Sequence, residues 1–343
     1  MKYKCHKKNT KFLIKLFIPI LLTLLMALIA LIAFKLKVKT KMMKANNIIK
    51  EKRIKRGNFD YFACFVAMGR QENKYARELV DYYFKLGVEK FILGDNNLPN
   101  TEKLSDVLQD YISKGIVDIF EIFGSSMGQA ELYNITYKTY KNKCNWFLFF
   151  DFDEFLEIYF QKEKKLALNE FLTNSIFNKC ESILFNWLTY SDNNLLHYDK
   201  RGVLERFTEP YFISKANIYV KCLVRGGLNK TVFIAKNSNH VPERGVTICD
   251  SKGNIRPTYN PFTISPPIYD YGFIKHFSSK TAEEYCDKIT RGHPTNVHLI
   301  PEERVKLFFK DNKFSKEKLN IFEKKFNKSF NPIANRESFR GNK

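Results

Sequence analysis

The segment FLFFDFDEF, residues 147–155, constrains the fold more than any other part of the sequence. It continues an unbroken apolar run, residues 146–150, which is typical of a strand buried on both faces inside an α/β sheet. Because side chains alternate in an extended chain, we expect Asp151 and Asp153 to project together while Phe152 turns back to the core. Two hard oxygen ligands would then converge on one point, as in a site for a divalent cation.

An isolated D-x-D after a strand is often only a solvated turn. Here four acids occur within seven residues directly after the apolar run, and they would repel one another unless they were solvated or neutralised by a cation. A metal or nucleotide-sugar site and a solvated turn are therefore the alternatives at this point. Glu154 and Glu157 are interpreted as hydrogen-bond acceptors behind the two aspartates.

The formal net charge of +21 is concentrated at the N-terminus. Residues 1–57 carry 16 Lys and Arg against one Glu, which leaves a net charge of +6 for residues 58–343. A nucleic-acid-binding domain typically carries its basic excess in the folded part. This distribution of charge favours basic segments that flank a membrane, and we expect no nucleic-acid partner. The net charge of the folded part does not exclude a local basic groove.

Residues 16–34 form a continuous apolar segment without a charged side chain. As a helix, these 19 residues reach about 28 Å, close to the thickness of a hydrocarbon core. A cleaved signal peptide is the competing interpretation, but its apolar region would be shorter and small residues would follow it. We therefore predict a single membrane anchor between a basic tail, residues 1–15, and a basic stem, residues 35–57. The slight excess of lysines before the anchor favours a cytoplasmic N-terminus, as in a type II protein of a secretory membrane or a bacterial inner membrane.

The first half of the folded part alternates strand and helix patterns. The predicted ranges are 59–68, 91–93 and 116–123 for strands and 73–86, 104–114 and 129–141 for helices. This order is typical of a Rossmann-like, mainly parallel sheet flanked by helices, which binds nucleotides at the carboxyl ends of its strands. Asp95, at the end of the second strand, is a candidate for binding the ribose or base, and a plain turn residue is the alternative.

The pattern changes in the second half, where shorter apolar runs alternate with polar loops. The strands predicted there are residues 182–187, 203–207, 217–224 and 230–235. We interpret this half as the part that binds the acceptor and covers the site.

Near the end, an alternating aromatic and polar pattern predicts a strand that ends at His276. Thr281 and Glu284 then form a capping box that starts a helix. His276 is a candidate third ligand for a metal or a pyrophosphate, and a satisfied structural histidine is the alternative. Lys288 and Arg291, three positions apart, are candidates for clamping a diphosphate. The alternative for Lys288 is an i,i+4 pair with Glu284.

The seven cysteines are widely spaced, and no C-x-x-C pair or Cys/His cluster indicates zinc. Cys64 and Cys144 lie inside apolar runs, where a buried free thiol is the usual explanation. The redox compartment therefore stays open at this level.

Four segments, in this order, resemble glycosyltransferase family 92 and its bacterial relatives among the family 2-like glycosyltransferases. They are GRQENKYARELVDYY, LGVEKFILGDNN, the Trp146-Phe147 step that leads into DFDEF, and KHFSSKTAEEYCDKITRG. The resemblance runs from about residue 62 to about residue 292, most of the folded part. One departure is Leu79, where the family pattern leads us to expect a Trp after Glu78; this concerns packing more than chemistry.

The resemblance implies a GT-A fold and the transfer of a sugar from a nucleotide-sugar donor, expected to be UDP-linked, to a hydroxyl of a glycan or glycoconjugate, with inversion. The implied ligands of Mn²⁺ or Mg²⁺ are Asp151, Asp153 and His276. The implied donor-binding residues are Glu72, Asp95, Asp151, Lys288 and Arg291. A base must also take the proton of the acceptor hydroxyl, and Glu205 and Asp192 are candidates that the sequence does not separate.

Two other classes of protein fit parts of the pattern. DFDEF also resembles the first motif of haloacid-dehalogenase-type phosphatases, but Glu154 follows where a small residue or Thr is usual. A non-catalytic, membrane-tethered carbohydrate-binding module is the other alternative, and it would not need both aspartates. We predict a glycosyltransferase domain with a nucleotide-sugar-binding half, residues 58–160, and an acceptor half, residues 161–311. A basic tail, residues 312–343, follows.

Overall fold

The computed structural model describes residues 58–122, 128–160, 164–229, 242, 245–257, 262–291 and 300–331, together with residues 26, 33 and 37. The chain forms two compact units, Met1–Asn58 and Phe59–Lys343, and the second carries the fold described below. No helix within the described residues is long and apolar enough to cross a membrane. Several predictions lie outside these residues: the basic tail at 1–15, the anchor at 16–34 apart from Met26 and Ala33, the stem at 35–57 apart from Lys37, the strand at 230–235, and residues 332–343 of the C-terminal tail.

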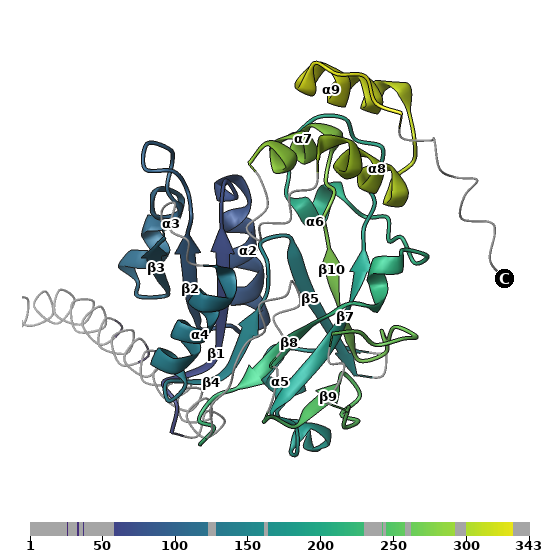
Figure 1. Ribbon diagram of the computed structural model, residues 1–343. Coiled ribbons are helices and arrows are strands. Elements are labelled where there is room, and N and C mark those ends of the chain that lie inside the picture. The colour runs from purple at the N-terminus through teal and green to yellow at the C-terminus, as the bar shows by residue number, and fades with distance from the viewer. Residues whose placement is uncertain are drawn as a thin grey trace, which may run out of the picture. The chain divides into compact units, whose positions relative to one another are not determined.

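A mixed ten-stranded sheet runs through the second unit (Figure 1). The strands are β1 Tyr61–Gly69, β2 Lys90–Asp95, β3 Val117–Glu121, β4 Cys144–Phe149, β5 Glu154–Phe160, β6 Lys164–Lys165, β7 Ser182–Thr189, β8 Val220–Arg225, β9 Ile248–Asp250 and β10 Gly272–His276. Their order is β3-β2-β1-β4-β8-β7-β10-β5-β6, and β9 pairs with β7. β8 and β5 run against the other described strands, so the predicted mainly parallel sheet is confirmed.

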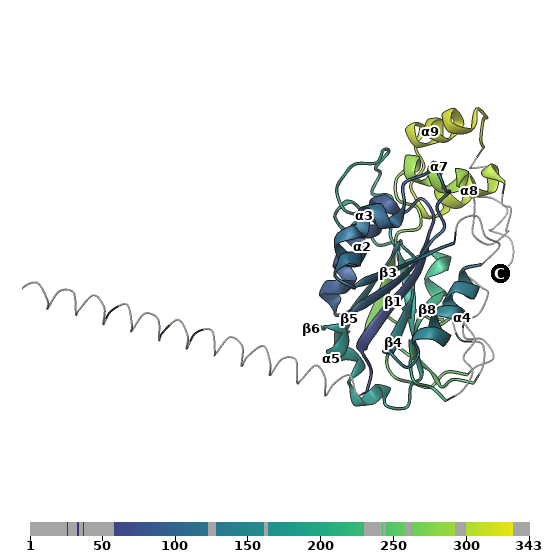
Figure 2. The same ribbon diagram turned by 90° about the vertical axis from the view of Figure 1, so that its left-hand side faces the viewer.

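Helices flank this sheet on both faces. The described α-helices are α2 Asn73–Leu86, α3 Leu104–Ser113, α4 Gln129–Tyr140, α5 Leu168–Leu172, α6 Val203–Arg206, α7 Ala282–Thr290, α8 Pro301–Asp311 and α9 Lys316–Phe326. Figure 2 shows α2 and α3 on one side of the strands and α4 on the other. α7, α8 and α9 form a group of their own at one end of the sheet, around Phe308 and Phe322.

The helix α2 illustrates how the sequence pattern becomes packing. Tyr75, Leu79, Tyr83 and Leu86 recur at helical spacing, and all four are buried in the core on one face of the sheet. The Tyr83 hydroxyl donates a hydrogen bond of 2.9 Å to the main-chain carbonyl of Glu154, the first residue of β5. The amphipathic face of α2 therefore both closes the core and fixes the strand that follows the acidic motif.

Three sequence predictions need correction. The segment predicted as a strand at residues 203–207 begins with the short helix α6, and its first N–H groups donate to the carboxylate of Glu78 on α2. Cys64 is not a free thiol but forms a disulfide with Cys144, joining β1 to β4, and a second disulfide joins Cys180 to Cys249. The predicted boundary at residue 312 falls between α8 and α9, which pack on α7.

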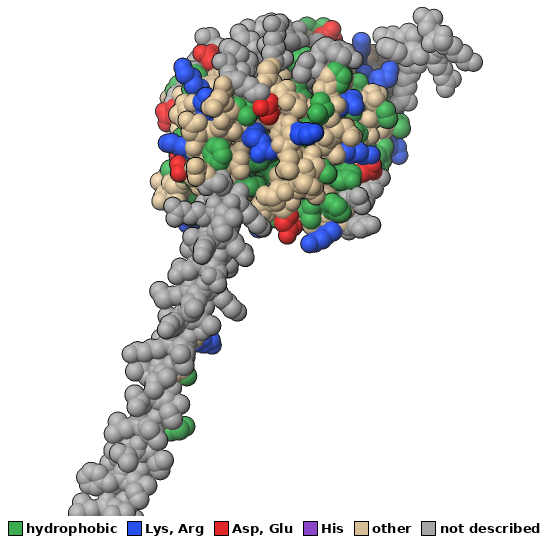
Figure 3. Space-filling view, turned by 90° about the horizontal axis from the view of Figure 1, so that it is seen from below, with side chains coloured by type: hydrophobic (Ala, Val, Ile, Leu, Met, Phe, Trp, Pro, Cys, Tyr) green, Lys and Arg blue, Asp and Glu red, His purple; other side chains and the backbone are tan. Residues whose placement is uncertain are grey.

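Charged side chains of both signs are interspersed on the face of the second unit that Figure 3 shows. Hydrophobic side chains are scattered between them. This face lies at the end of the sheet away from α7, α8 and α9, whereas the pocket described below lies beside α7.

Candidate functional site

The acidic motif forms a tight turn between β4 and β5, at the carboxyl end of the parallel strands β1 and β4. Phe152 and Asp153 lie in this turn, so the predicted extended conformation of the motif is wrong. The N–H of Glu154 donates to the carbonyl of Asp151 at 3.2 Å and closes the turn. Phe152 is buried in the core, as expected, and Asp153 is buried as well. The turn thus directs the two aspartates into different surroundings.

Protein donors occupy both carboxylate oxygens of Asp151. Its Oδ1 accepts a hydrogen bond of 2.6 Å from Gln129 Nε2, and its Oδ2 lies 2.6 Å from the ammonium of Lys221. Lys221, on β8, is fully buried and also lies 3.5 Å from Glu154 Oε1. Burial lowers the pKa of Lys221, but Asp151 and Glu154 outweigh that effect and raise it, so the ammonium stays charged. Sequence reasoning missed Lys221, although a lysine inside the apolar run VKCLV was a visible signal.

Asp153 meets two side chains that lie far from it in the sequence. Its Oδ1 is 3.9 Å from His276 Nε2, and its Oδ2 accepts a hydrogen bond of 3.0 Å from Lys288 Nζ. Burial would raise the pKa of Asp153, but Lys288, Lys280 and His276 outweigh burial and hold it below its usual value. Burial lowers the pKa of His276 to about 4, so this imidazole is neutral near pH 7.

Trp187 forms the wall of the site on the side of β7. Its ring centroid lies 4.1 Å from that of His276, and β7 runs parallel to β10, which ends at His276. Within the described part of the chain, Trp187 Nε1 and His276 Nδ1 are buried and have no hydrogen-bond partner. A neutral imidazole with one nitrogen toward Asp153 and an aromatic ring behind it is therefore held in place by packing more than by hydrogen bonds.

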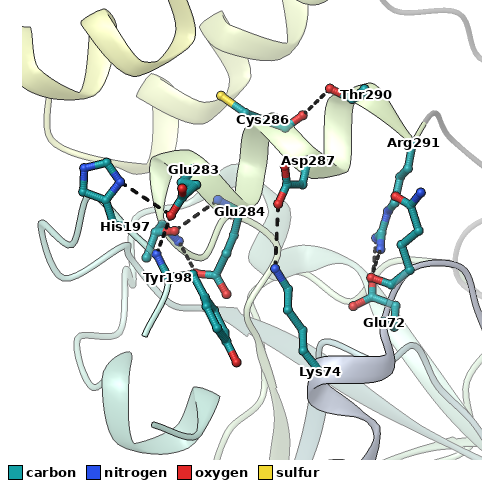
Figure 4. Close-up of polar contacts among 12 residues, drawn as sticks. Glu72, Lys74, His197, Tyr198, Glu283, Glu284, Cys286, Asp287, Thr290 and Arg291 are labelled. Atoms are coloured by element: carbon teal, nitrogen blue, oxygen red, sulfur yellow. Dashed lines mark hydrogen bonds and ion pairs between the residues drawn. The ribbon is translucent and has the colours of Figure 1, made fainter. Parts of the chain in front are cut away.

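A pocket of about 480 Å³ lies between the residues that follow β1 and β2 and the helix α7. Five cations line it: Lys74, Lys280, Lys288, Arg291 and Lys325. Figure 4 shows Arg291 paired with Glu72, and Lys74 reaching toward Asp287 at 3.8 Å. Arg291 also donates to the carbonyl of Arg70 at 2.7 Å. Glu72, Lys288 and Arg291 thus meet in one pocket, and Lys288 pairs with Asp153 instead of Glu284.

Asp95 does not line this pocket. Its Oδ1 accepts from the N–H of Asn97 at 2.8 Å, and its Oδ2 accepts from the N–H of Leu104 at 2.7 Å. Because Leu104 is the first residue of α3, the carboxylate fixes the turn and the start of that helix. Asp95 therefore has the hydrogen bonds of a turn residue. This was the alternative to its predicted role in binding the ribose or base.

The two candidates for the catalytic base lie apart from the pocket. Asp192 is buried and lies 2.6 Å from the ammonium of Lys318 on α9, while its N–H donates to Asn312 Oδ1 at 2.7 Å. Burial raises the pKa of Asp192, and Lys318 opposes that effect. Glu205 lies exposed on α6. Neither carboxylate lines the pocket of about 480 Å³.

We expect Asp192→Asn to lower stability by about 3–5 kcal/mol, because it leaves Lys318 buried without its counter-charge. Chemical denaturation measures this change, and turnover per folded molecule is measured beside it. Asp199→Asn is the matched control, since Asp199 pairs with Arg201 on the surface. A stable Asp192→Asn protein that has lost turnover would instead support Asp192 as the base.

The fold is similar to that of S. aureus TarS 1–349 in complex with UDP-GlcNAc, which aligns over 78% of this chain and 72% of that chain, at 12% identity and a TM-score of 0.37. The S. aureus TarS 1–349 complex with UDP aligns over 82% of this chain and 75% of that chain, at 11% identity and a TM-score of 0.35. The comparison with curated protein sequences found no significant match. The family model of glycosyltransferase family 92 matches residues 60–250, more than half of the chain, and the chain therefore belongs to glycosyltransferase family 92.

Proposed function

We propose that this glycosyltransferase moves a sugar from a UDP-linked donor to a hydroxyl of a glycan or glycoconjugate, with inversion, on a GT-A fold. The observation that carries the proposal is the pocket beyond the ends of β1 and β2, beside the buried Asp153, whose lining includes five cations and four carboxylates. Nucleotides bind at this edge of parallel sheets, and cations there match a diphosphate. Lys288 and Arg291 would hold its oxygens, since phosphate competes with the carboxylates that they now contact.

The donor atoms at Asp153 and His276 fit a divalent cation. A carboxylate and a neutral imidazole are ligand types that suit Mn²⁺, and Asp153 Oδ1 and His276 Nε2 lie 3.9 Å apart, so these two side chains would hold the cation. No group of three or more His, Cys, Asp or Glu side chains among the described residues is arranged to hold a metal. Diphosphate oxygens and water would complete the shell. When bound, Mn²⁺ or Mg²⁺ would stabilise the charge that develops on the departing nucleotide.

The protein side chains have separate tasks in this proposal. Asp153 and His276 hold the cation, and the buried Lys221 fixes the turn through Asp151. Asp151, with both oxygens engaged, contributes to the site chiefly by keeping this turn in place. Glu205 stays a proposed base, and Glu205→Gln would then lower kcat by about 10²-fold or more without changing the Kd for the donor.

We further propose that residues 16–34 anchor the chain as a type II membrane protein, with the catalytic unit on the side away from the cytoplasm. The disulfides Cys64–Cys144 and Cys180–Cys249 support this orientation, because disulfides persist in oxidising compartments and are rare in the cytosol.

The experiment that tests the function is donor hydrolysis by the detergent-solubilised full chain. A panel of nucleotide sugars is screened with Mn²⁺ and with a chelator. We expect nucleotide release from one donor, at least tenfold slower with the chelator. Release that is indifferent to the chelator would contradict the metal, and a protein that binds and cleaves no nucleotide sugar would contradict the donor class.

A further inference from the structure

One lysine of the pocket is buried and forms no ion pair. Lys280 has a relative exposure of 4% and lines the pocket of about 480 Å³. Among the residues that the structure describes, none accepts a hydrogen bond from its ammonium and none forms an ion pair with it. Its ammonium lies over the ring of Tyr75, 4.4 Å from the ring centroid. Lysine is almost never buried in this way unless it is paired.

The other two cations contributed by the segment from residue 280 to residue 291 are already neutralised. Lys288 lies 3.0 Å from Asp153, and Arg291 pairs with Glu72. An anion that enters the pocket can therefore meet Lys280 without displacing a carboxylate, whereas Lys288 and Arg291 must first give up theirs. Burial lowers the pKa of Lys280, and the charges of Glu72 and Asp153 oppose that effect.

The backbone and the neighbouring ring hold Lys280 in place. Its φ of +54° lies in the left-handed region, which residues other than glycine adopt uncommonly. It immediately precedes Thr281, the N-cap of α7. The ring of Tyr75 is fixed in turn, because its hydroxyl donates a hydrogen bond of 2.6 Å to Glu284. The fold thus keeps an unpaired cation in a preorganised position.

We propose that Lys280 binds a phosphate oxygen of a nucleoside diphosphate and sets the preference of the pocket for a diphosphate over a less charged nucleotide. The identity of the anion rests on the proposed function; the presence of an anion-binding site at Lys280 does not. Lys280 was not among the residues expected from the sequence, because the pattern of the segment SSKTAEE marks it only as the residue before a helix cap.

The test compares the parent with Lys280→Met as solubilised full-length proteins in a buffer that contains a chelator. Calorimetry measures the binding of inorganic pyrophosphate, UDP, UMP and uridine. We expect Lys280→Met to weaken pyrophosphate and UDP by tenfold or more and to leave uridine within twofold. Lys252→Met is the control, because Lys252 is exposed, pairs with Asp270 and lies outside the pocket; it should stay within threefold of the parent for every probe.

Thermal melting separates binding from folding in this experiment. Because Lys280 has no ion-pair partner among the described residues, Lys280→Met should melt at or above the temperature of the parent. If Lys280→Met binds pyrophosphate and UDP like the parent, the inference is overturned while the proposed donor stands. If pyrophosphate binding depends on Lys280 but no nucleotide binds, Lys280 is supported and the proposed donor is overturned.

Discussion

Asp153→Asn is expected to reduce sugar transfer and donor hydrolysis by about 10²–10³-fold. The substitution keeps the size of the side chain but removes the charge that His276 and Lys288 face. A neutral amide would neither hold a divalent cation nor offset Lys288, so the diphosphate would lose the arrangement that stabilises its developing charge. The measurement is kcat with and without saturating Mn²⁺, together with the Kd for the donor.

Asp151→Asn is compared with Asp153→Asn, because the two substitutions should differ in their effects on stability. Asp151 holds the fully buried Lys221, so its replacement should lower stability first, by about 3–5 kcal/mol. Asp153 instead faces Lys288, which is 25% exposed and can rehydrate its ammonium. We therefore expect Asp153→Asn to melt within a few degrees of the parent. A folded Asp153→Asn protein with the activity of the parent would contradict the assignment of Asp153 to the active site.

Sequence reasoning predicted the part of the fold that depends on local pattern. The apolar run before the acidic motif became β4, and the helical periodicity of residues 73–86 became α2 with the same bounds. The capping box at Thr281 also started α7 as expected. These features are encoded by neighbours in the chain, since periodicity and caps act over a few residues.

The features that were missed depend on partners far away in the sequence. The segment VLERF resembles a strand locally, but Glu78 of α2 accepts hydrogen bonds from its first N–H groups and so favours a helix. Lys221 and Lys280 are ordinary lysines in the sequence, and their importance comes from burial beside Asp151 and Tyr75. A local sequence pattern does not predict which distant carboxylate will form an ion pair with a buried lysine.

The same dependence on distant partners makes Arg206 critical for stability. Its guanidinium forms two hydrogen bonds of 2.8 and 2.9 Å with the carboxylate of Glu284, and both side chains are almost fully buried. Tyr75 adds a hydrogen bond to the same carboxylate, so α2, α6 and α7 meet at one charge. We expect Arg206→Met to lower the free energy of unfolding by about 3–5 kcal/mol, because Glu284 would be buried without its counter-charge.

The pH dependence of the parent gives an independent measure of this pair. Burial would raise the pKa of Glu284, but the hydrogen bonds from Arg206 and Tyr75 and the charge of Arg206 lower it to about 2, against 4.5 for a glutamate in water. A lowered folded-state pKa contributes stability that is present above the unfolded value and is lost as the pH falls. The pair should therefore contribute about 3 kcal/mol above pH 5 and lose it between about pH 4.5 and pH 2.

Urea denaturation of four proteins at pH 7 measures the contribution of the Arg206–Glu284 pair to the free energy of unfolding. They are the parent, Arg206→Met, Glu284→Gln and the double variant. The double variant should be more stable than Arg206→Met, because it no longer buries an unpaired carboxylate. Arg201→Met is the surface control, since Arg201 pairs with the exposed Asp199, and it should change stability by less than about 1 kcal/mol. If Arg206→Met unfolds at the same urea concentration as Arg201→Met, the buried pair does not hold α6 and α7 together.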